Sequence, residues 1–196
     1  MRKKCIIIYT EGETEHEFYG SLINEIKKEY IVEKFSANKI IRQCLKGITK
    51  FDKKLLKKFE YDVKTKYGEY DIVVFLCYDT DVFDLNAKPP VDWKKVDEKL
   101  KTLGAKKVYH IKAEKCIEDI LLTDISNICK FLNIPIINRI SGKNGVEKMK
   151  KLFMKGNRIY QKGFLCGNLI ETLDIGLLLN KHNKMFKELI DELLKP

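Results

Sequence analysis

Two unbroken apolar stretches constrain the fold of this chain more than any other feature of its sequence. They are "KCIIIYT" (residues 4–10) and "YDIVVFLCYD" (residues 70–79), and each is apolar throughout its middle. A strand with one solvent-facing side alternates apolar and polar residues, whereas a strand buried on both sides does not. Both stretches therefore predict central strands of a parallel sheet, which carries helices on both faces.

Further strands and segments of helical periodicity alternate with these two stretches. "NKIIRQC" (38–44) and "KKVYHIKA" (106–113) are the other strand candidates. Apolar residues at helical spacing predict helices in residues 14–31, 50–66, 89–104, 114–132, 145–155, 166–180 and 182–194. The alternation predicts an α/β fold with a mainly parallel sheet of about four strands flanked by helices. We expect one domain, with a core of about 1–135 and a basic helical C-terminal extension of about 136–196.

The charge of the chain favours an anionic partner, with nucleic acid first. The formal net charge is +10 at pH 7, and residues 139–166 hold eight Lys or Arg against one acid. Acidic residues concentrate instead around 11–17 and 79–84. A Lys-rich proteome alone also produces a basic chain. Local acidic pockets on a basic protein, however, are what a metal-dependent enzyme that acts on a polyanion needs.

Several classes of protein are disfavoured by composition. The six cysteines are widely spaced, without a C-x-x-C pair or zinc-ligand spacing, which is typical of small buried side chains in a reducing compartment. No apolar run approaches the roughly 20 residues that span a bilayer, so we expect no membrane association through a spanning helix. The apolar run after the basic amino terminus is too short for a signal peptide, and a cytoplasmic protein is expected.

The first acidic stretch, "TEGETEHEF", follows directly on the first predicted strand. Thr14 and Glu17 have the spacing of a capping box, and the helix macrodipole favours Glu15 and Glu17 in a first turn. Capping does not explain Glu11, which lies before the cap at the carboxyl end of a buried strand, where α/β sheets bind ligands. If Gly12 forms a tight turn, Glu11 and Glu15 face the same cavity.

The second acidic stretch ends the strongest predicted strand. Asp79 and Asp81 flank Thr80, and in an extended chain their carboxylates point the same way, roughly 6–7 Å apart. Two such carboxylates suit Mg²⁺, although aspartates also end many strands without any function. Two carboxylate clusters at two strand ends of one sheet favour the functional interpretation.

These motifs resemble the Toprim domain, the fold shared by topoisomerases, bacterial primases and several nucleases. The E-G-x-T-E form at Glu11–Glu15, the aromatic pair that follows it, and the D-x-D at Asp79–Asp81 look most like the RloB-like and OLD-type nuclease branch. That branch is associated with phage defence and mobile elements. Residues 113–134 and 141–163 are loosely similar to later segments of these proteins. The resemblance implies a Toprim-like (Rossmann-like) sheet.

The resemblance also implies roles for the acids. Glu11 would be the general acid/base or a metal ligand, and Asp79 and Asp81 would bind Mg²⁺, with Mn²⁺ as a substitute. Glu15 is a candidate for a further ligand. Glu118 follows the fourth predicted strand and is either another ligand or an ordinary residue of a helix start.

Basic residues supply the remaining candidates. Lys143, in the loop Gly142–Gly145, would stabilise the leaving group or the phosphate, unless it belongs to a plain surface turn. Interleaved basic and aromatic residues suit nucleic acid, although the same lysines would also form a solvated helix face. The candidate nucleic-acid contacts are Lys148, Lys151, Lys155, Arg158 and Lys162.

The sequence therefore predicts a Mg²⁺-dependent nuclease that hydrolyses phosphodiester bonds in RNA or DNA. No G-x-x-x-x-G-K-[ST] motif and no DNA-specific accessory domain is present, so such a nuclease would act alone or with a partner protein encoded elsewhere. The alternative is a catalytically inactive Toprim-fold module that binds nucleic acid or another protein. A small-molecule phosphotransfer enzyme is less favoured, because the chain has no glycine-rich phosphate loop.

Overall fold

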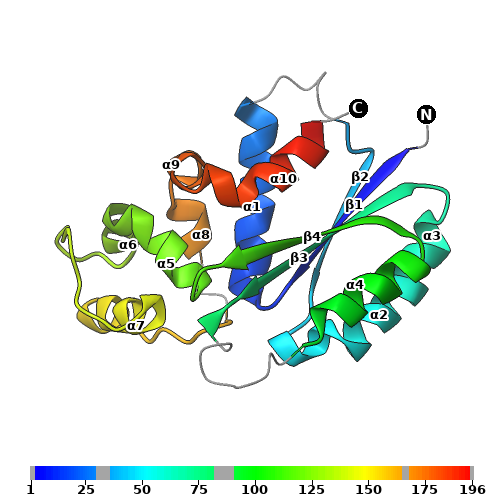
Figure 1. Cartoon of the computed structure of the whole chain (residues 1–196). Coiled ribbons are helices and arrows are strands. Elements are labelled where there is room, and N and C mark those ends of the chain that lie inside the picture. Colours follow the sequence, from blue (N-terminus) through cyan, green and yellow to red (C-terminus); the bar gives the residue numbers. More distant parts are fainter. Residues whose placement is uncertain (1–2, 30–35, 82–90, 165–167, 195–196) are drawn as a thin grey trace.

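The fold is α/β, with four parallel strands in one sheet. The computed structural model describes residues 3–29, 36–81, 91–164 and 168–194. Its strands are β1 (Lys4–Thr10), β2 (Lys39–Cys44), β3 (Asp71–Asp79) and β4 (Ala105–Ala113), in the spatial order β2-β1-β3-β4 (Figure 1). All pairings are parallel. The two unbroken apolar stretches are the central strands β1 and β3, as predicted, because only central strands of a covered sheet are buried on both faces.

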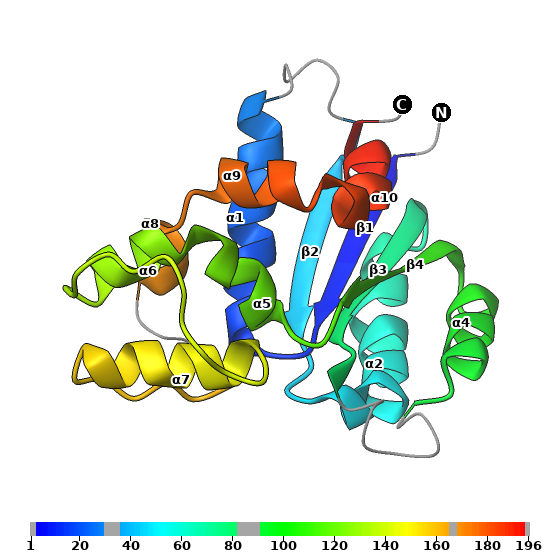
Figure 2. The ribbon, with the colours of Figure 1, turned by 60° about the vertical axis from the view of Figure 1, so that its left-hand side comes forward.

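Helices cover both faces of the sheet (Figure 2). Ile6 and Ile8 of β1 face α1 (Glu13–Glu29) and the C-terminal helices, whereas Ile7 and Tyr9 face the opposite layer. That second layer consists of α4 (Trp93–Thr102) and a helical segment made of a 3-10 turn (Ile48–Phe51), α2 (Lys53–Lys58), a π-helical stretch (Phe59–Lys64) and α3 (Thr65–Tyr67).

The C-terminal helices belong to the same apolar core as the sheet. They are α5 (Ile117–Leu121), α6 (Ile125–Phe131), α7 (Gly145–Lys155), α8 (Leu169–Thr172), α9 (Ile175–Lys181) and α10 (Asn183–Leu194). Phe186 of α10 packs against Phe18 of α1, with ring centroids 6.0 Å apart. Glu192, on the same helix, accepts hydrogen bonds from Lys107 and Tyr109 of β4. The helical part after residue 136 is therefore bound to the sheet by apolar and polar contacts.

Two predicted helices are interrupted, and an aspartate causes each break. The segment predicted at 114–132 starts at Ile117 and passes through a 3-10 turn, where Asp124 caps α6 by accepting the Asn127 N–H. The segment predicted at 166–180 breaks before α9, where Asp174 accepts the Leu177 N–H. An Asp side chain that satisfies free N–H groups favours a new helix start over a continuous helix.

Other predictions fall partly outside the described residues. These are the end of the helix at 30–31, the acid Asp84, the Pro-rich start of the helix at 89–90, and residues 166–167. Among the described cysteines all five are free thiols, and Cys5, Cys77, Cys116 and Cys129 are buried. No described helix is both long enough and apolar enough to cross a membrane.

Candidate active site

The two acidic stretches meet where the strand order reverses. After β1 the chain moves to β2 on one side, whereas β3 and β4 lie on the other, so the carboxyl ends of β1 and β3 form the topological switch point. Thr10 pairs with Cys77, which places Glu11 and Asp79 just beyond the last paired residues of β1 and β3, and Asp79 pairs with Ala113 of β4 on its other side. The Glu11 carboxylate accepts the Asp79 N–H at 3.4 Å. Open α/β sheets bind their ligands at this position.

Asp79 and Asp81 share one counter-ion. The Nζ of Lys162 lies 2.9 Å from Asp79 Oδ2 and 2.6 Å from Asp81 Oδ2, so both carboxylates face the same point. The Asp79 side chain is only 1% exposed, and its Oδ1 accepts the N–H of Ile117 at the start of α5 at 2.9 Å. Lys162 was expected among the nucleic-acid contacts, and the structure places it inside the acidic cluster.

Glu15 and Glu118 add two buried carboxylates from helix starts. Glu15 lies in the first turn of α1 and Glu118 in the first turn of α5, with 5% and 0% exposure. The Tyr160 hydroxyl donates to Glu118 Oε1 at 2.7 Å. Among the described residues, Glu15 Oε2 and Glu118 Oε2 are buried without any hydrogen-bond partner. Buried carboxylate oxygens in this state are costly unless a proton or a cation joins them.

The pKa values of three carboxyl groups in the cluster are raised, first by burial and then by neighbouring carboxylates. Burial, helped by the charges of Glu11 and Glu118, raises the pKa of Glu15 to about 7. Burial and the Glu15 charge raise the pKa of Asp79 to about 8, against the opposing effect of Lys162. Burial also raises the pKa of Glu11, and Lys162 again opposes the shift. One lysine does not neutralise five neighbouring carboxylates.

The pKa of Lys162 moves the other way. Burial lowers it, but the adjacent Asp79 and Asp81 carboxylates outweigh burial, and the net effect is a raised pKa. Lys162 therefore stays charged at every physiological pH. Among the described residues, Lys162 is the cation that pairs with Asp79 and Asp81.

The start of α1 is shaped by close backbone approach. A Cβ on Gly12 would lie 2.5 Å from Glu15 Oε2 and 3.1 Å from Gly163 Cα, so no larger residue fits there without movement. The predicted capping box is wrong. The helix begins at Glu13, and the Thr14 hydroxyl donates to the Phe164 carbonyl at 3.0 Å. Thr14 thus ties α1 to the segment that carries Lys162.

A cavity of about 470 Å³ opens beside these acids. Acids, lysines, glycines and one phenylalanine form its wall: Glu11, Gly12, Glu13, Glu15, Lys46, Gly47, Lys162, Gly163 and Phe164. Lys46 and Phe164 escaped the sequence analysis, since neither belongs to a motif. Lys46 has a positive φ of 64° and pairs with Glu13 at 2.9 Å, which brings the loop after β2 to the cavity.

The other predicted basic residues lie apart from this cluster. Lys148 pairs with Asp119 at 3.7 Å, and Lys151 pairs with Glu147 at 2.9 Å. Lys155 is exposed, and the Arg158 guanidinium lies 4.7 Å from the ring centroid of Phe131. Lys143 is exposed, and its backbone N–H donates to Glu147 at 2.8 Å. The lysine that joins the acids is therefore Lys162.

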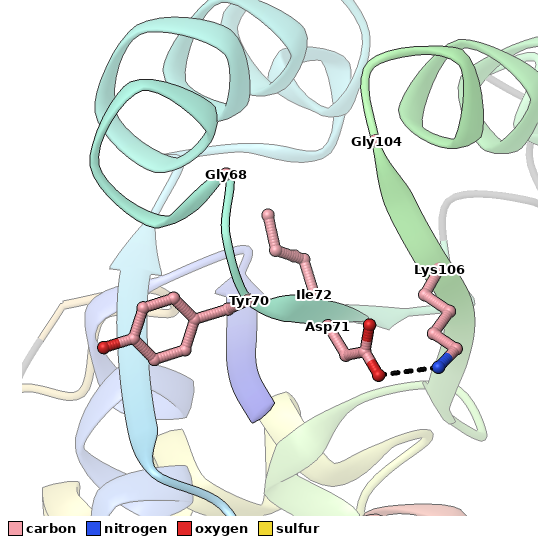
Figure 3. Close-up of a pocket in the computed structure, with 6 residues that line it drawn as sticks. All are labelled: Gly68, Tyr70, Asp71, Ile72, Gly104 and Lys106. Atoms are coloured by element: carbon pink, nitrogen blue, oxygen red, sulfur yellow. Dashed lines mark hydrogen bonds and ion pairs between the residues drawn. The ribbon is translucent and has the colours of Figure 1, made fainter. Parts of the chain in front are cut away.

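A second cavity, of about 620 Å³, lies at the opposite end of the sheet. Figure 3 shows Asp71 and Lys106, at the starts of β3 and β4, joined by an ion pair of 2.6 Å across its wall. Its single acid is already neutralised by a lysine. Of these two cavities, only the one at the carboxyl end is beside an excess of carboxylates, in the described part of the chain.

The carboxyl-end residues fit a cation in charge and chemistry, since they supply hard oxygen donors, some of them buried without a hydrogen-bond partner among the described residues. As they stand, no three Asp, Glu, His or Cys side chains of the described residues are arranged to hold a metal ion. The ammonium of Lys162 lies between the two aspartates instead. Ion binding at Asp79 and Asp81 therefore requires that this lysine move away.

The chain was compared with known proteins at the level of sequence families and of structures. No protein-family model, curated protein or solved structure matches it. The Toprim resemblance stays a prediction that rests on the motifs at Glu11–Glu15 and Asp79–Asp81. What the chain does is inferred from the geometry and charge of its acidic cluster.

Proposed function

We propose that this chain is a Mg²⁺-dependent nuclease that hydrolyses phosphodiester bonds in RNA or DNA. The observation that carries the proposal is the charge imbalance at the carboxyl end of β1 and β3. Five carboxylates, those of Glu11, Glu15, Asp79, Asp81 and Glu118, lie near one another, and Lys162 pairs with two of them, in a protein whose net charge is +10. A basic protein with one cluster of buried carboxylates suits a polyanionic substrate, because divalent ions can lie between the carboxylates and the phosphates.

The proposed Mg²⁺ ligands are Asp79, Asp81 and Glu15. Glu118 lies deeper in the protein. If these residues hold Mg²⁺, the chemistry it would supply is activation of a water and compensation of the charge that develops on the phosphate. Glu118 is fully buried and fixed by Tyr160, so it orients the cluster from within. Glu11 lines the cavity with a pKa raised by burial, which suits a group that takes a proton from the attacking water.

Lys162 takes the role for which sequence reasoning favoured Lys143. If the two aspartates were to hold an ion, the ammonium of Lys162 would be free to approach a phosphate oxygen in the same cavity. A charged donor at that position stabilises the negative charge that develops as the bond breaks. Its contacts with Asp79 and Asp81 keep it within reach.

The test is cleavage of labelled single-stranded RNA, single-stranded DNA and duplex DNA by the purified chain in Mg²⁺, Mn²⁺ or EDTA. We expect products with either metal and none in EDTA. Asp79→Asn keeps the size of the side chain and should abolish cleavage. Asp71→Asn, at the other end of the same strand, is the matched control and should keep it. Equal cleavage by wild type and Asp79→Asn would refute the site.

One observation favours the alternative of an inactive nucleic-acid-binding module. Lys162 already pairs with both aspartates, which is the arrangement expected if no ion ever binds there. A module of this kind would bind oligonucleotides equally in EDTA and in Mg²⁺ and would yield no products. The same cleavage experiment, extended to binding in both conditions, separates the two functions.

A further inference from the structure

Phe164 is an exposed aromatic side chain on the wall of the acidic cavity. It is 56% exposed, and it lines the same 470 Å³ space as Glu11, Glu15 and Lys162. Single exposed apolar residues are common on proteins and need no explanation by themselves. What distinguishes Phe164 is its place on a cavity wall whose other described residues are charged residues and glycines.

The backbone holds Phe164 in place beside the proposed phosphate position. The Phe164 carbonyl accepts the Thr14 hydroxyl at 3.0 Å, and the Phe164 N–H donates to the Gln161 carbonyl at 3.3 Å. The preceding carbonyl, of Gly163, accepts the Glu13 N–H at 3.2 Å. These bonds attach the segment to the first turn of α1. Phe164 is thus presented by a fixed turn.

The chain distance from Phe164 to the acidic cluster is short. Lys162, which pairs with Asp79 and Asp81, is only two residues earlier, and two residues of extended chain span at most about 7 Å. Gly163 between them has a positive φ of 80°, so the chain turns there. Gly47 and Gly163 leave bare backbone on the same wall, which gives a sugar and phosphate room to approach.

We propose that Phe164 is a stacking platform for the base of the nucleotide whose phosphate lies at the Lys162–Asp79 cluster. The inference rests on the proposed nuclease function and names its substrate class: a single strand, or a nucleic acid with unpaired bases. A paired base in a duplex has both of its faces covered by neighbours, so it cannot meet a side chain face to face. Aromatic stacking of this kind is tolerant of base identity.

The test measures binding of labelled single-stranded and duplex oligonucleotides of one sequence, in Ca²⁺ to suppress turnover. Wild type should prefer the single strand. Phe164→Ala should bind the single strand about tenfold more weakly, which is within the range known for base–aromatic stacking. It should therefore lose most of the preference for the single strand over the duplex. Phe164→Trp should keep both, whereas Phe164→Leu, which is apolar but not aromatic, should resemble Phe164→Ala. Tyr61→Ala removes an aromatic residue that is 68% exposed and lies outside the cavity wall, and it should bind like wild type.

An oligonucleotide with one abasic position, moved along the strand, locates the stacked base. At that position wild type should lose the same tenfold, and Phe164→Ala should lose nothing more, because the two changes remove one interaction. Additive losses at every position would overturn the stacking role. So would Phe164→Ala that binds like wild type. If Phe164→Ala binds like wild type while Asp79→Asn loses cleavage, stacking fails alone; if Asp79→Asn still cleaves, the proposed function itself fails.

Discussion

The ammonium group of Lys162 lies 2.9 Å from a carboxylate oxygen of Asp79, a side chain that is only 1% exposed. The two residues are far apart in sequence, and they meet at the carboxyl end of the sheet, where Asp79 ends β3. A buried ion pair contributes little net stability, but removal of one partner leaves an uncompensated charge, which costs about 3–5 kcal/mol. On the proposed function, Lys162 is therefore a counter-ion that Mg²⁺ would have to replace at Asp79 and Asp81.

The variant Lys162→Met tests this replacement. Without the ammonium, Mn²⁺ no longer has to displace a positive charge from Asp79 and Asp81. We therefore expect titration calorimetry to show tighter Mn²⁺ binding than in wild type. Cleavage should fall by about 10²–10³-fold, as when one charge-stabilising donor is removed from an active site. Opposite changes in metal affinity and in rate are the signature of this role. Weaker Mn²⁺ binding in the variant would show that Lys162 supports the ion instead of competing with it.

The buried acids predict an unusual dependence of stability on pH. Glu15 and Asp79 have folded-state pKa values of about 7 and about 8, above their ordinary values of 4.5 and 3.8. Between pH 5 and pH 8 the folded state thus holds protons that the unfolded chain has released, and the free energy of unfolding falls as the pH rises. In EDTA we expect Tm to decrease over this range, by about 2–4 °C for each kcal/mol by which the free energy of unfolding falls.

Saturating Mn²⁺ should remove that decrease, since a cation favours the ionised carboxylates and lowers their pKa values. Glu15→Gln should also flatten the dependence, in this case without metal. Thermal scans at several pH values, with and without Mn²⁺, measure both effects. A Tm that stays constant or rises from pH 5 to pH 8 in EDTA contradicts the prediction.

Gly12→Ala is expected to disturb the site by steric contact. The new methyl group would lie 2.5 Å from Glu15 Oε2 and 3.1 Å from Gly163 Cα, so the carboxylate and the turn before Phe164 must shift. We expect weaker Mn²⁺ binding and at least tenfold slower cleavage, since small displacements of positioning groups cost about 10²-fold in rate.

Gly176→Ala is the matched control for this change. Its Cβ would have its nearest contact at 3.4 Å, an ordinary van der Waals distance, within helix α9. Alanine is favoured over glycine in a helix by about 1 kcal/mol, so stability should be kept or increased and activity unchanged. Gly12→Ala with wild-type metal affinity and rate would place Glu15 outside the working site.

The salt dependence of binding tests the basic residues of and around α7. Lys148 and Lys151 are engaged with acids, whereas Lys155 is exposed. If Lys155 contacts a phosphate, Lys155→Ala should weaken binding to all sequences and reduce the slope of log K against log salt by about one. Lys151→Ala should change the slope less, because Glu147 already neutralises Lys151. Equal slopes for wild type and Lys155→Ala would mean that the lysine belongs to a solvated helix face.

Local patterns were sufficient to predict the strands and most helices. β1 and β3 are apolar throughout because both of their faces are covered, and this property is visible in sequence. The breaks at Asp124 and Asp174 were missed, since an aspartate in a helical pattern looks like any other polar residue. Whether such an aspartate caps a new helix depends on which N–H groups lie near it in the tertiary structure. Asp124, for example, also accepts the backbone N–H of Asp174 at 2.7 Å, a contact between distant parts of the chain.

The sequence by itself determined the α/β class and the proximity of Glu11 to Asp79, because the carboxyl ends of neighbouring parallel strands meet at one edge. Only the tertiary structure decided which basic residue joins them. Lys162 lies 81 positions after Asp81, in a segment without a motif, and its place follows from hydrogen bonds between α1 and the turn at Gly163. Contacts of such long range depend on how helices pack, which local residue patterns do not encode.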